Sequence, residues 1–470
     1  MARPKNGKNK RLSTLIIAES ILIAYVSYTA FFMVKLADVF APSFAVQHIF
    51  PLVIFTLFIV LSQLAVGLYE PKLRETFRGI IRRIFVAQGM AFFAMAVFSE
   101  LFLTHVLMHS YYLVVCILMT ILSCSIFRFF VIRFGALGLA QTRIVILGAG
   151  ERAAVIENRM RRASDRKGFE LIGFIPIPGD NTKLGVKKEP ILHVNIDDSF
   201  KEFIAENDID EIVVAADQRR GTLPIEVLFD CRLQGTQITD LLDFMERETG
   251  QILVNLMYPS WLIYSGGFNS QNYVRQISDY ALNFCLASFV LFFVWPFMLL
   301  TALAIYLDDG RKTGASIFYK QIRVGKDGEN FGIYKFRSMG VDAEKNGAQW
   351  ASKNDARVTR IGGFIRKYRL DELPQLYNVF RGDMSFVGPR PERPEFVEQL
   401  IKEVPFYNQR HNVKPGLAGW AQLNYPYGAS VKDAMEKLKF DLYYVKHQSF
   451  LLDILVLIRT VEVVLFGKGQ

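Results

Sequence analysis

The sequence predicts a multidomain membrane protein: four transmembrane helices, a Rossmann-like α/β domain, and a mainly helical domain with a re-entrant membrane helix. Three observations predict it. Apolar runs with alternating basic flanks fill the N-terminal part, a glycine turn follows a strand pattern in the middle, and basic glycine- and proline-rich motifs fill the C-terminal part. A chain of 470 residues exceeds one ordinary core, so we place three domains at 1–138, 139–265 and 266–470.

The composition agrees with a membrane protein that meets anions. Hydrophobic residues make up 51% of the chain, and its mean hydropathy is +0.22. The net charge of +10 indicates an anionic partner, such as a phosphate ligand or a lipid surface. The basic residues gather at membrane flanks and around phosphate-type turns, so we expect no nucleic-acid partner. The four cysteines lack paired or metal-ligand spacing and are interpreted as core residues.

Four apolar stretches predict the transmembrane helices. They cover about 15–36, 49–69, 84–102 and 112–134, each close to the ~20 residues that span a bilayer. The first and third connections carry no Lys or Arg, whereas the N-terminus, the second connection and the end of the fourth stretch are basic. By the positive-inside rule, both ends of this domain face the cytoplasm. The length of the first run and the absence of a small-residue cleavage site disfavour a signal peptide.

The middle part carries a nucleotide-type turn. A strand-like run, Arg143 to Leu147, precedes Gly148-Ala149-Gly150-Glu151-Arg152-Ala153, a Gly-x-Gly-x-x-Ala pattern that suits a pyrophosphate at a helix N-terminus. A dinucleotide site also needs an acid at the end of its second strand, where this chain has Pro176-Ile177-Pro178. We therefore favour a degenerate, structural domain over a working cofactor site.

A further apolar run covers about 280–306. Pro296 in its middle removes a helical hydrogen bond and favours a kink, and basic residues stand on both flanks. A helix that enters and leaves by the cytoplasmic face accounts for both features. The alternative is a fifth spanning helix.

Two adjacent acids carry the strongest chemical signal. Asp371 and Glu372 precede Pro374 and a helical pattern, which predicts that both lie at a helix N-terminus. Neighbouring acids point in different directions, so one is expected to attack a phosphorus and the other to hold Mg²⁺. Lys335, Arg337 and Arg390 are the candidate clamps for phosphoryl oxygens. The plainer alternative makes Asp371 an N-cap and Glu372 a dipole-complementing acid.

Three motifs give this part a family resemblance. They are, in order, Lys335-Phe336-Arg337-Ser338-Met339, Asp371-Glu372-Leu373-Pro374-Gln375 and Ser385-Phe386-Val387-Gly388-Pro389-Arg390-Pro391. From about Val274 onward the chain resembles the bacterial sugar transferases, the polyprenyl-phosphate hexose-1-phosphate transferases. The whole architecture resembles their large members, in which four spanning helices and a Rossmann-like (CoA-binding-like) domain precede the catalytic domain.

The resemblance implies an activity. Hexose-1-phosphate would pass from a UDP-sugar, with glucose or galactose as the hexose, to undecaprenyl phosphate, releasing UMP. This would be the first step of exopolysaccharide, capsule or O-antigen (lipopolysaccharide) assembly. It implies a nucleophilic Asp371, a Glu372 that assists Mg²⁺ binding, and a re-entrant helix broken at Pro296. It also implies a multi-pass protein of the bacterial inner membrane, in contact with membrane lipids, with its catalytic domain on the cytoplasmic face. A homodimer is left open.

The remaining site predictions follow the motifs. Arg323 joins Lys335, Arg337 and Arg390 as a predicted phosphate-binding residue, and the supporting turns are predicted at Pro389, Pro391, Pro415 and Gly416. Ala418 departs from the family pattern, in which Thr or Ser is usual at this position. Lys414 also departs from it, because Arg is frequent there.

Two rival functions remain. An NAD-dependent nucleotide-sugar dehydratase or epimerase needs a Tyr-x-x-x-Lys pair, and none of the 19 tyrosines has a lysine four residues on. A non-catalytic membrane scaffold is disfavoured by the intact acid pair.

Overall fold

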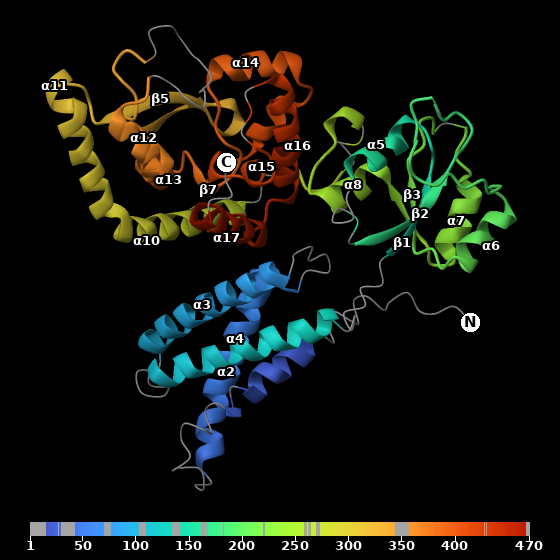
Figure 1. Cartoon of the computed structure of the whole chain (residues 1–470), viewed down its shortest axis with the longest axis horizontal. Helices are drawn as coiled ribbons and strands as arrows, with labels where there is room; N and C mark the ends of the chain where they lie inside the picture. The colour runs from blue at the N-terminus through green and yellow to red at the C-terminus, as the bar shows by residue number, and fades with distance from the viewer. Residues whose placement is uncertain are drawn as a thin grey trace. The chain divides into compact units, whose positions relative to one another are not determined.

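The computed structural model describes 16–26, 28–29, 43–69, 77–102, 110–133, 142–160, 166, 168–181, 183–219, 221–257, 261, 265–268, 273–343, 357–426, 428 and 430–466 (Figure 1). The chain divides into two compact units, Met1–Phe244 and Met245–Gln470. The predicted domain boundaries near 138 and 265 stay predictions.

The N-terminal part of the first unit is built from apolar helices. Helices α2 (Ser43–Ala65), α3 (Phe77–Phe102) and α4 (Ser110–Arg133) follow a shorter apolar helix at Ile16–Val26. Gly79–Ala96 and Leu113–Val131 are long and apolar enough to cross a membrane, whereas the apolar stretch within α2 covers Val53–Leu64. The rest of the first predicted segment lies outside the described residues. Membrane-type helices are therefore present here, and their number of four stays a prediction.

A buried ion pair joins the first helix to α4. Arg128 Nη2 lies 2.6 Å from Glu19 Oε2, and both side chains are almost fully buried. The guanidinium also lies over the ring of Tyr69, 5.0 Å from its centroid. Charges in an apolar helical layer persist when they are paired, so this contact fixes how the two helices face each other.

The middle domain has the predicted α/β architecture. Its parallel sheet has the order β2-β1-β3-β4, from strands β1 (Thr142–Leu147), β2 (Phe169–Ile175), β3 (Glu211–Val214) and β4 (Gln237–Asp240). The helices are α5 (Glu151–Arg159), α6 (Asp198–Glu206), α7 (Ile225–Leu233) and α8 (Leu241–Thr249). Figure 1 shows α6 and α7 over one face of the sheet, where Phe200 and Leu228 pack against Val145 and Val214. The central strands β1 and β3 are buried on both faces, which explains their continuous apolar runs in the sequence.

Acidic side chains of the domain itself occupy the glycine turn. The amides of Glu151 and Arg152, at the start of α5, donate to the carboxylate of Asp217 at 2.9 and 2.8 Å. The amide of Ala149 donates to Asp180 at 2.8 Å. A Cβ added at Gly150 would lie 2.0 Å from Asp217 Oδ2, so the missing side chain makes room for this carboxylate. Amides that would hold a pyrophosphate already hold acids, which supports the structural interpretation of the domain.

Asp217→Ala should therefore loosen the start of α5. Asp217 accepts hydrogen bonds from the amides of Glu151, Arg152 and Asn181, so its loss should cost about 2–3 kcal/mol locally. Amide hydrogen exchange at the first turn of α5 measures this. Asp197→Ala is the matched control, because the side chain of Asp197 accepts from one backbone amide at the start of α6, that of Ser199, and its loss should have a smaller effect on α6. Equal effects of the two variants would contradict the prediction.

The second unit is mainly helical, as predicted. Its helices are α10 (Tyr273–Ile305), α11 (Arg311–Thr313), α12 (Arg360–Lys367), α13 (Leu376–Arg381), α14 (Pro394–Glu403), α15 (Trp420–Asn424), α16 (Val431–His447) and α17 (Phe450–Phe466). Short helical turns are η2 (Val254–Leu256), η3 (Tyr306–Gly310), η4 (Lys326–Gly328), η5 (Leu370–Gln375) and η6 (Tyr407–Asn412). The strands β5 (Phe318–Val324) and β6 (Asn330–Phe336) pair antiparallel, and β7 (Ser385–Val387) pairs parallel with β8 (Gly416–Ala418).

Helix α10 is one bent helix with Pro296 inside it (Figure 1). Before Pro296, Ala287 and Leu291 pack with the core around Leu376. After it, Ala302 and Ile305 pack on Phe336 of β6 and Ile365 of α12, in a second hydrophobic core. Both halves of α10 therefore rest on the same domain. The remaining surface is apolar and open: Phe292, Phe293, Phe297 and Leu300 are all more than half exposed.

Candidate active site

The acid pair lies in the first turn of η5, as predicted. The chain reaches η5 through Arg369, whose φ of 58° places a non-glycine residue in the left-handed region. This sharp entry, which costs about 1 kcal/mol or more, redirects the chain between α12 and η5. Asp371 is 9% exposed and Pro374 is buried in the same turn.

Three cations surround Glu372. Its Oε1 lies 3.0 Å from Arg390 Nη2, 3.7 Å from Lys335 Nζ and 3.8 Å from Arg369 Nη1. Three distant motifs therefore meet at one carboxylate, because Lys335 comes from β6 and Arg390 from the turn after β7.

The surroundings push the pKa values of the two acids apart. Burial alone would raise the pKa of Glu372, but Arg390, Lys335 and Arg369 lower it to about 2. Burial, with Glu372 nearby, raises the pKa of Asp371 above its usual value. Burial also lowers the pKa of Lys335 to about 8. Two adjacent carboxyl groups with different environments are suited to different roles.

Two basic residues beside Asp371 were not among the site residues predicted from the sequence. Arg366 and Arg369 both act electrostatically on Asp371. Arg366 Nη1 and Gln375 Nε2 are buried with no hydrogen-bond partner among the described residues, so both donors are free for a ligand. The basic run Arg366-Lys367-Tyr368-Arg369, directly before the acid motif, was the available signal.

Asn378 holds the acid-bearing segment against β6. Its Nδ2 donates to the Gly332 carbonyl at 2.7 Å, and its Oδ1 accepts from the Tyr334 amide at 3.1 Å. The side chain is fully buried. This amide fixes the strand that carries Lys335 relative to the helix that follows Asp371.

The predicted supporting turns form one structure. Strands β7 and β8 pair, and beyond them the Gly388 amide donates to Ala418 O at 2.9 Å while the Gly416 amide donates to Pro389 O at 3.0 Å. A Cβ on Gly416 would lie 2.1 Å from the Gly388 nitrogen. Gly416 therefore permits the close backbone contact that supports the turn with Arg390. Ala418, which departs from the family pattern, contributes its carbonyl to this contact.

Pro391 and Arg323 form a second support of the same turn. Arg323 Nη1 donates to Pro391 O at 3.0 Å, its Nε and Nη2 bond to Gln321, and Glu392 lies 3.5 Å away. The described contacts of Arg323 are thus with protein groups, and its binding to phosphate stays a prediction. Arg337 follows β6 directly, and both terminal nitrogens of its guanidinium are buried; its role likewise stays a prediction.

Mg²⁺ stays a prediction, and the residues that would hold it are Asp371 and Glu372. This ion is usually held by one or two carboxylates together with substrate phosphates, and Asp371 and Glu372 supply two adjacent carboxylates. Among the described residues, no group of three or more His, Cys, Asp or Glu side chains could hold a metal without a substrate. Bound there, the ion would neutralise charge on phosphoryl oxygens.

A buried Asp371 beside a half-buried Glu372 with three cations around it, in a domain that carries a long apolar helix, is typical of a membrane-associated enzyme that acts on phosphate esters. Comparison with known proteins gives the family. A model of the bacterial sugar transferase family matches residues 274–467, and a CoA-binding domain model matches residues 64–221.

Relatives cover both halves of the chain. A UDP-glucose:undecaprenyl-phosphate glucose-1-phosphate transferase of Xanthomonas campestris pv. campestris is 30% identical over 70% of this chain and 68% of its own length. A UDP-galactose-lipid carrier transferase of Erwinia amylovora is 29% identical over 70% of each chain. A UDP-N-acetylgalactosamine-undecaprenyl-phosphate N-acetylgalactosaminephosphotransferase of Aeromonas hydrophila is 48% identical over 37% of this chain, and the match spans only 40% of that relative. The chain belongs to the bacterial sugar transferase family.

Gly416→Ala should separate β8 from the turn that carries Arg390. The added Cβ would overlap the Gly388 nitrogen, so we expect activity to fall about 10- to 100-fold, since a shift near 1 Å at a site has this effect. The measurement is the rate of UMP release from a UDP-sugar, with thermal unfolding recorded in parallel. Gly363→Ala is the control: it lies in α12 with its nearest neighbour 4.0 Å from the new Cβ, and should retain activity. An active Gly416→Ala enzyme would contradict the structural role.

Proposed function

We propose that this protein transfers hexose-1-phosphate from a UDP-hexose to undecaprenyl phosphate, with Asp371 as nucleophile. The charge around Asp371 carries the proposal. Lys335, Arg369 and Arg390 lie within 3.8 Å of Glu372, and Arg366 acts electrostatically on Asp371, so the cations here outnumber the two carboxylates. A diphosphate would neutralise this surplus. The names of the relatives in the same family support the same substrate class.

The transfer proceeds in two half-reactions. A carboxylate oxygen of Asp371 attacks the β-phosphorus of the UDP-sugar, the bond from phosphorus to the UMP oxygen breaks, and UMP leaves with the electron pair. An oxygen of undecaprenyl phosphate then attacks the same phosphorus and releases the Asp371 carboxylate. Two steps allow a soluble donor and a lipid acceptor to use one site in turn.

Glu372 and the cations would hold the phosphoryl group in place. With a pKa of about 2, Glu372 stays ionised at neutral pH and keeps Arg390 and Lys335 in position. Asp371, less strongly paired, remains available to attack. Arg390 and Lys335 would then face the charge that develops on the phosphoryl oxygens.

The bent helix α10 supports a re-entrant attachment to the cytoplasmic face of the inner membrane. Residues before and after Pro296 pack on one domain, and a spanning helix would carry one of these contacts to the opposite surface. The exposed Phe292, Phe293 and Leu300 suit the hydrocarbon layer. This geometry would hold Asp371 at headgroup level, where undecaprenyl phosphate presents its phosphate. A homodimer stays a prediction.

The identity of the hexose can be tested with a panel of UDP-sugars. The names of the relatives include glucose, galactose and N-acetylgalactosamine. Glucose or galactose is the sequence-based prediction, and UMP release from these three UDP-sugars by the purified protein tests it. Release from none of them would overturn the proposed function.

Asp371→Asn should abolish turnover, because the amide oxygen is a poor nucleophile. We expect UMP release to fall by more than about a thousandfold, and mass spectrometry should find no phosphosugar adduct. Asp327→Asn is the control, since Asp327 is an exposed acid of the same unit in a left-handed conformation that Asn tolerates. An active Asp371→Asn enzyme, or an adduct mapped to Glu372, would contradict the assigned roles.

Cysteine labelling tests the topology. In a variant without the four native cysteines, cysteines placed at Lys10, Lys72, Arg152 and Gln470 should react only from the cytoplasmic side. His105→Cys, in the third connection, should react from the outside and serves as the control. A C-terminus accessible from outside would show that the apolar run at 280–306 spans the bilayer.

A further inference from the structure

The backbone of the turn that carries Arg390 is held at three consecutive carbonyls. Arg390 O accepts from Arg410 Nη2 at 2.9 Å, Pro391 O accepts from Arg323 Nη1 at 3.0 Å, and Glu392 O accepts from the Val324 amide at 2.9 Å. Two of the three bonds come from β5. The bond to Arg390 itself comes from a different part of the domain.

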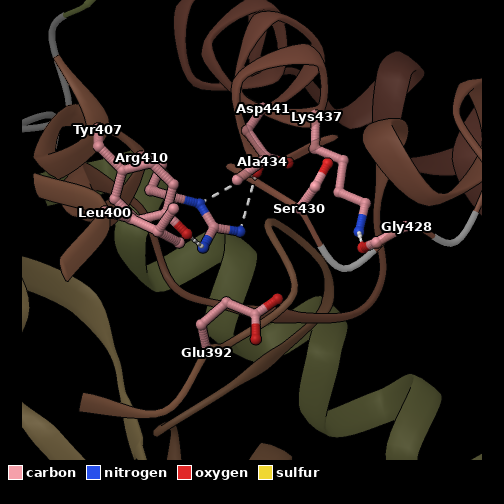
Figure 2. A pocket seen from close by; sticks show the side chains of 9 residues that line it. All are labelled: Glu392, Leu400, Tyr407, Arg410, Gly428, Ser430, Ala434, Lys437 and Asp441. Carbon is pink, nitrogen blue, oxygen red and sulfur yellow. Dashed lines mark hydrogen bonds and ion pairs between the residues drawn. The ribbon is translucent and has the colours of Figure 1, made fainter. Parts of the chain in front are cut away.

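Arg410 lies in η6 and is 5% exposed. Its Nε and Nη2 lie 3.0 and 2.9 Å from Asp441 Oδ2, and its Nη1 donates to Tyr407 OH at 3.0 Å. Figure 2 shows the guanidinium between Tyr407 and Asp441, with Glu392 on the opposite side of the cavity. Burial alone would lower the pKa of Arg410, but Tyr407 and Asp441 raise it, so the side chain stays charged.

The geometry of a guanidinium makes this contact rigid. Its donors lie in one plane in a fixed fork, so a bond to Asp441 determines where the other donors point. Asp441 belongs to α16, a helix of 17 residues. Because Arg410 bonds both to this helix and to Arg390 O, it fixes the backbone from which the Arg390 side chain reaches Glu372.

We propose that Arg410 is a positioning residue for Arg390. The proposal rests on the proposed function for its consequence in catalysis, but the contact itself involves no substrate. Arg410, held by Asp441, fixes the peptide of Arg390, and the Arg390 guanidinium is thereby placed at Glu372 and at the phosphoryl group beside Asp371.

A ligand in the cavity next to Arg410 is not needed to explain the contacts of Arg410. Its polar side chains bond within the protein: Lys437 Nζ donates to Gly428 O at 2.7 Å, Arg410 bonds to Asp441, and Glu392 lies 3.5 Å from Arg323 (Figure 2). The carbonyl of Arg390 is the acceptor that links this group of residues to the active site.

Arg410→Lys is the first test. Lysine keeps a positive charge beside Asp441, but its single ammonium cannot reproduce the planar fork that reaches Asp441 and Arg390 O together. We expect kcat for UMP release to fall about 10- to 100-fold, with KM for the UDP-sugar changed less than about threefold. Tyr407→Phe is the matched control: it removes the bond to Nη1 and leaves both other contacts, so its kcat should stay within about twofold of the wild-type value.

Hydrogen exchange gives a readout that needs no enzyme activity. A peptide covering 385–392 should exchange faster in Arg410→Lys than in the wild type or in Tyr407→Phe. This result would stand even if no UDP-sugar were a substrate, so failure of the proposed function and failure of this inference are distinguishable. Unchanged exchange in Arg410→Lys overturns the inference.

A double variant covers the case in which Arg410→Lys does not fold. Arg410→Met with Asp441→Leu removes both buried charges together, a replacement that proteins often tolerate. It also removes the donor to Arg390 O, so faster exchange at 385–392 and the same loss of kcat are expected. Unchanged kcat in this folded variant, or an equal loss in Tyr407→Phe, overturns the positioning role.

Discussion

The contact of Arg390 with Glu372 is the interaction on which the rest of the catalytic domain depends. Two adjacent carboxylates that are largely removed from water destabilise the fold unless cations compensate them. Arg390 and Lys335 come from segments on either side of the acid pair in the chain, so the compensation requires the tertiary fold. Asn378, Gly416 and Arg323 each fix one of the segments that bring these charges together.

Helix α10, which is apolar enough to enter a membrane, also packs on the segment that carries the acid pair. It packs on α13 through Ala287, and on η5 and α12 through Ile305. A displaced helix would therefore disturb the segment that carries Asp371. One bent helix that contains Pro296 therefore carries both the exposed apolar side chains and part of the packing of the segment with Asp371.

Prediction from the sequence succeeded where the signal is local. The acids in a first helical turn and the strand before Gly148 follow from neighbouring residues alone. The left-handed Arg369, the buried Asn378 and the Arg410 contact depend on which segments meet in space, and no local pattern encodes that. The contacts of Arg323 with Gln321, Pro391 and Glu392 depend on the same tertiary arrangement, and its predicted binding to phosphate stays a prediction.

The glycine turn before α5 and the site around Asp371 both suit an anion, but they differ in whether their hydrogen-bond donors already have partners. At the start of α5, amides that favour an anion are already bonded to Asp217 and Asp180, so an incoming pyrophosphate would have to displace two carboxylates. Around Asp371 the cations outnumber the acids, and donors on Arg366 and Gln375 lack a partner among the described residues. Binding of a phosphorylated substrate should be most favourable where it relieves an existing excess of positive charge. By this criterion the proposed nucleotide-sugar site at Asp371 is favoured over the glycine turn of the middle domain.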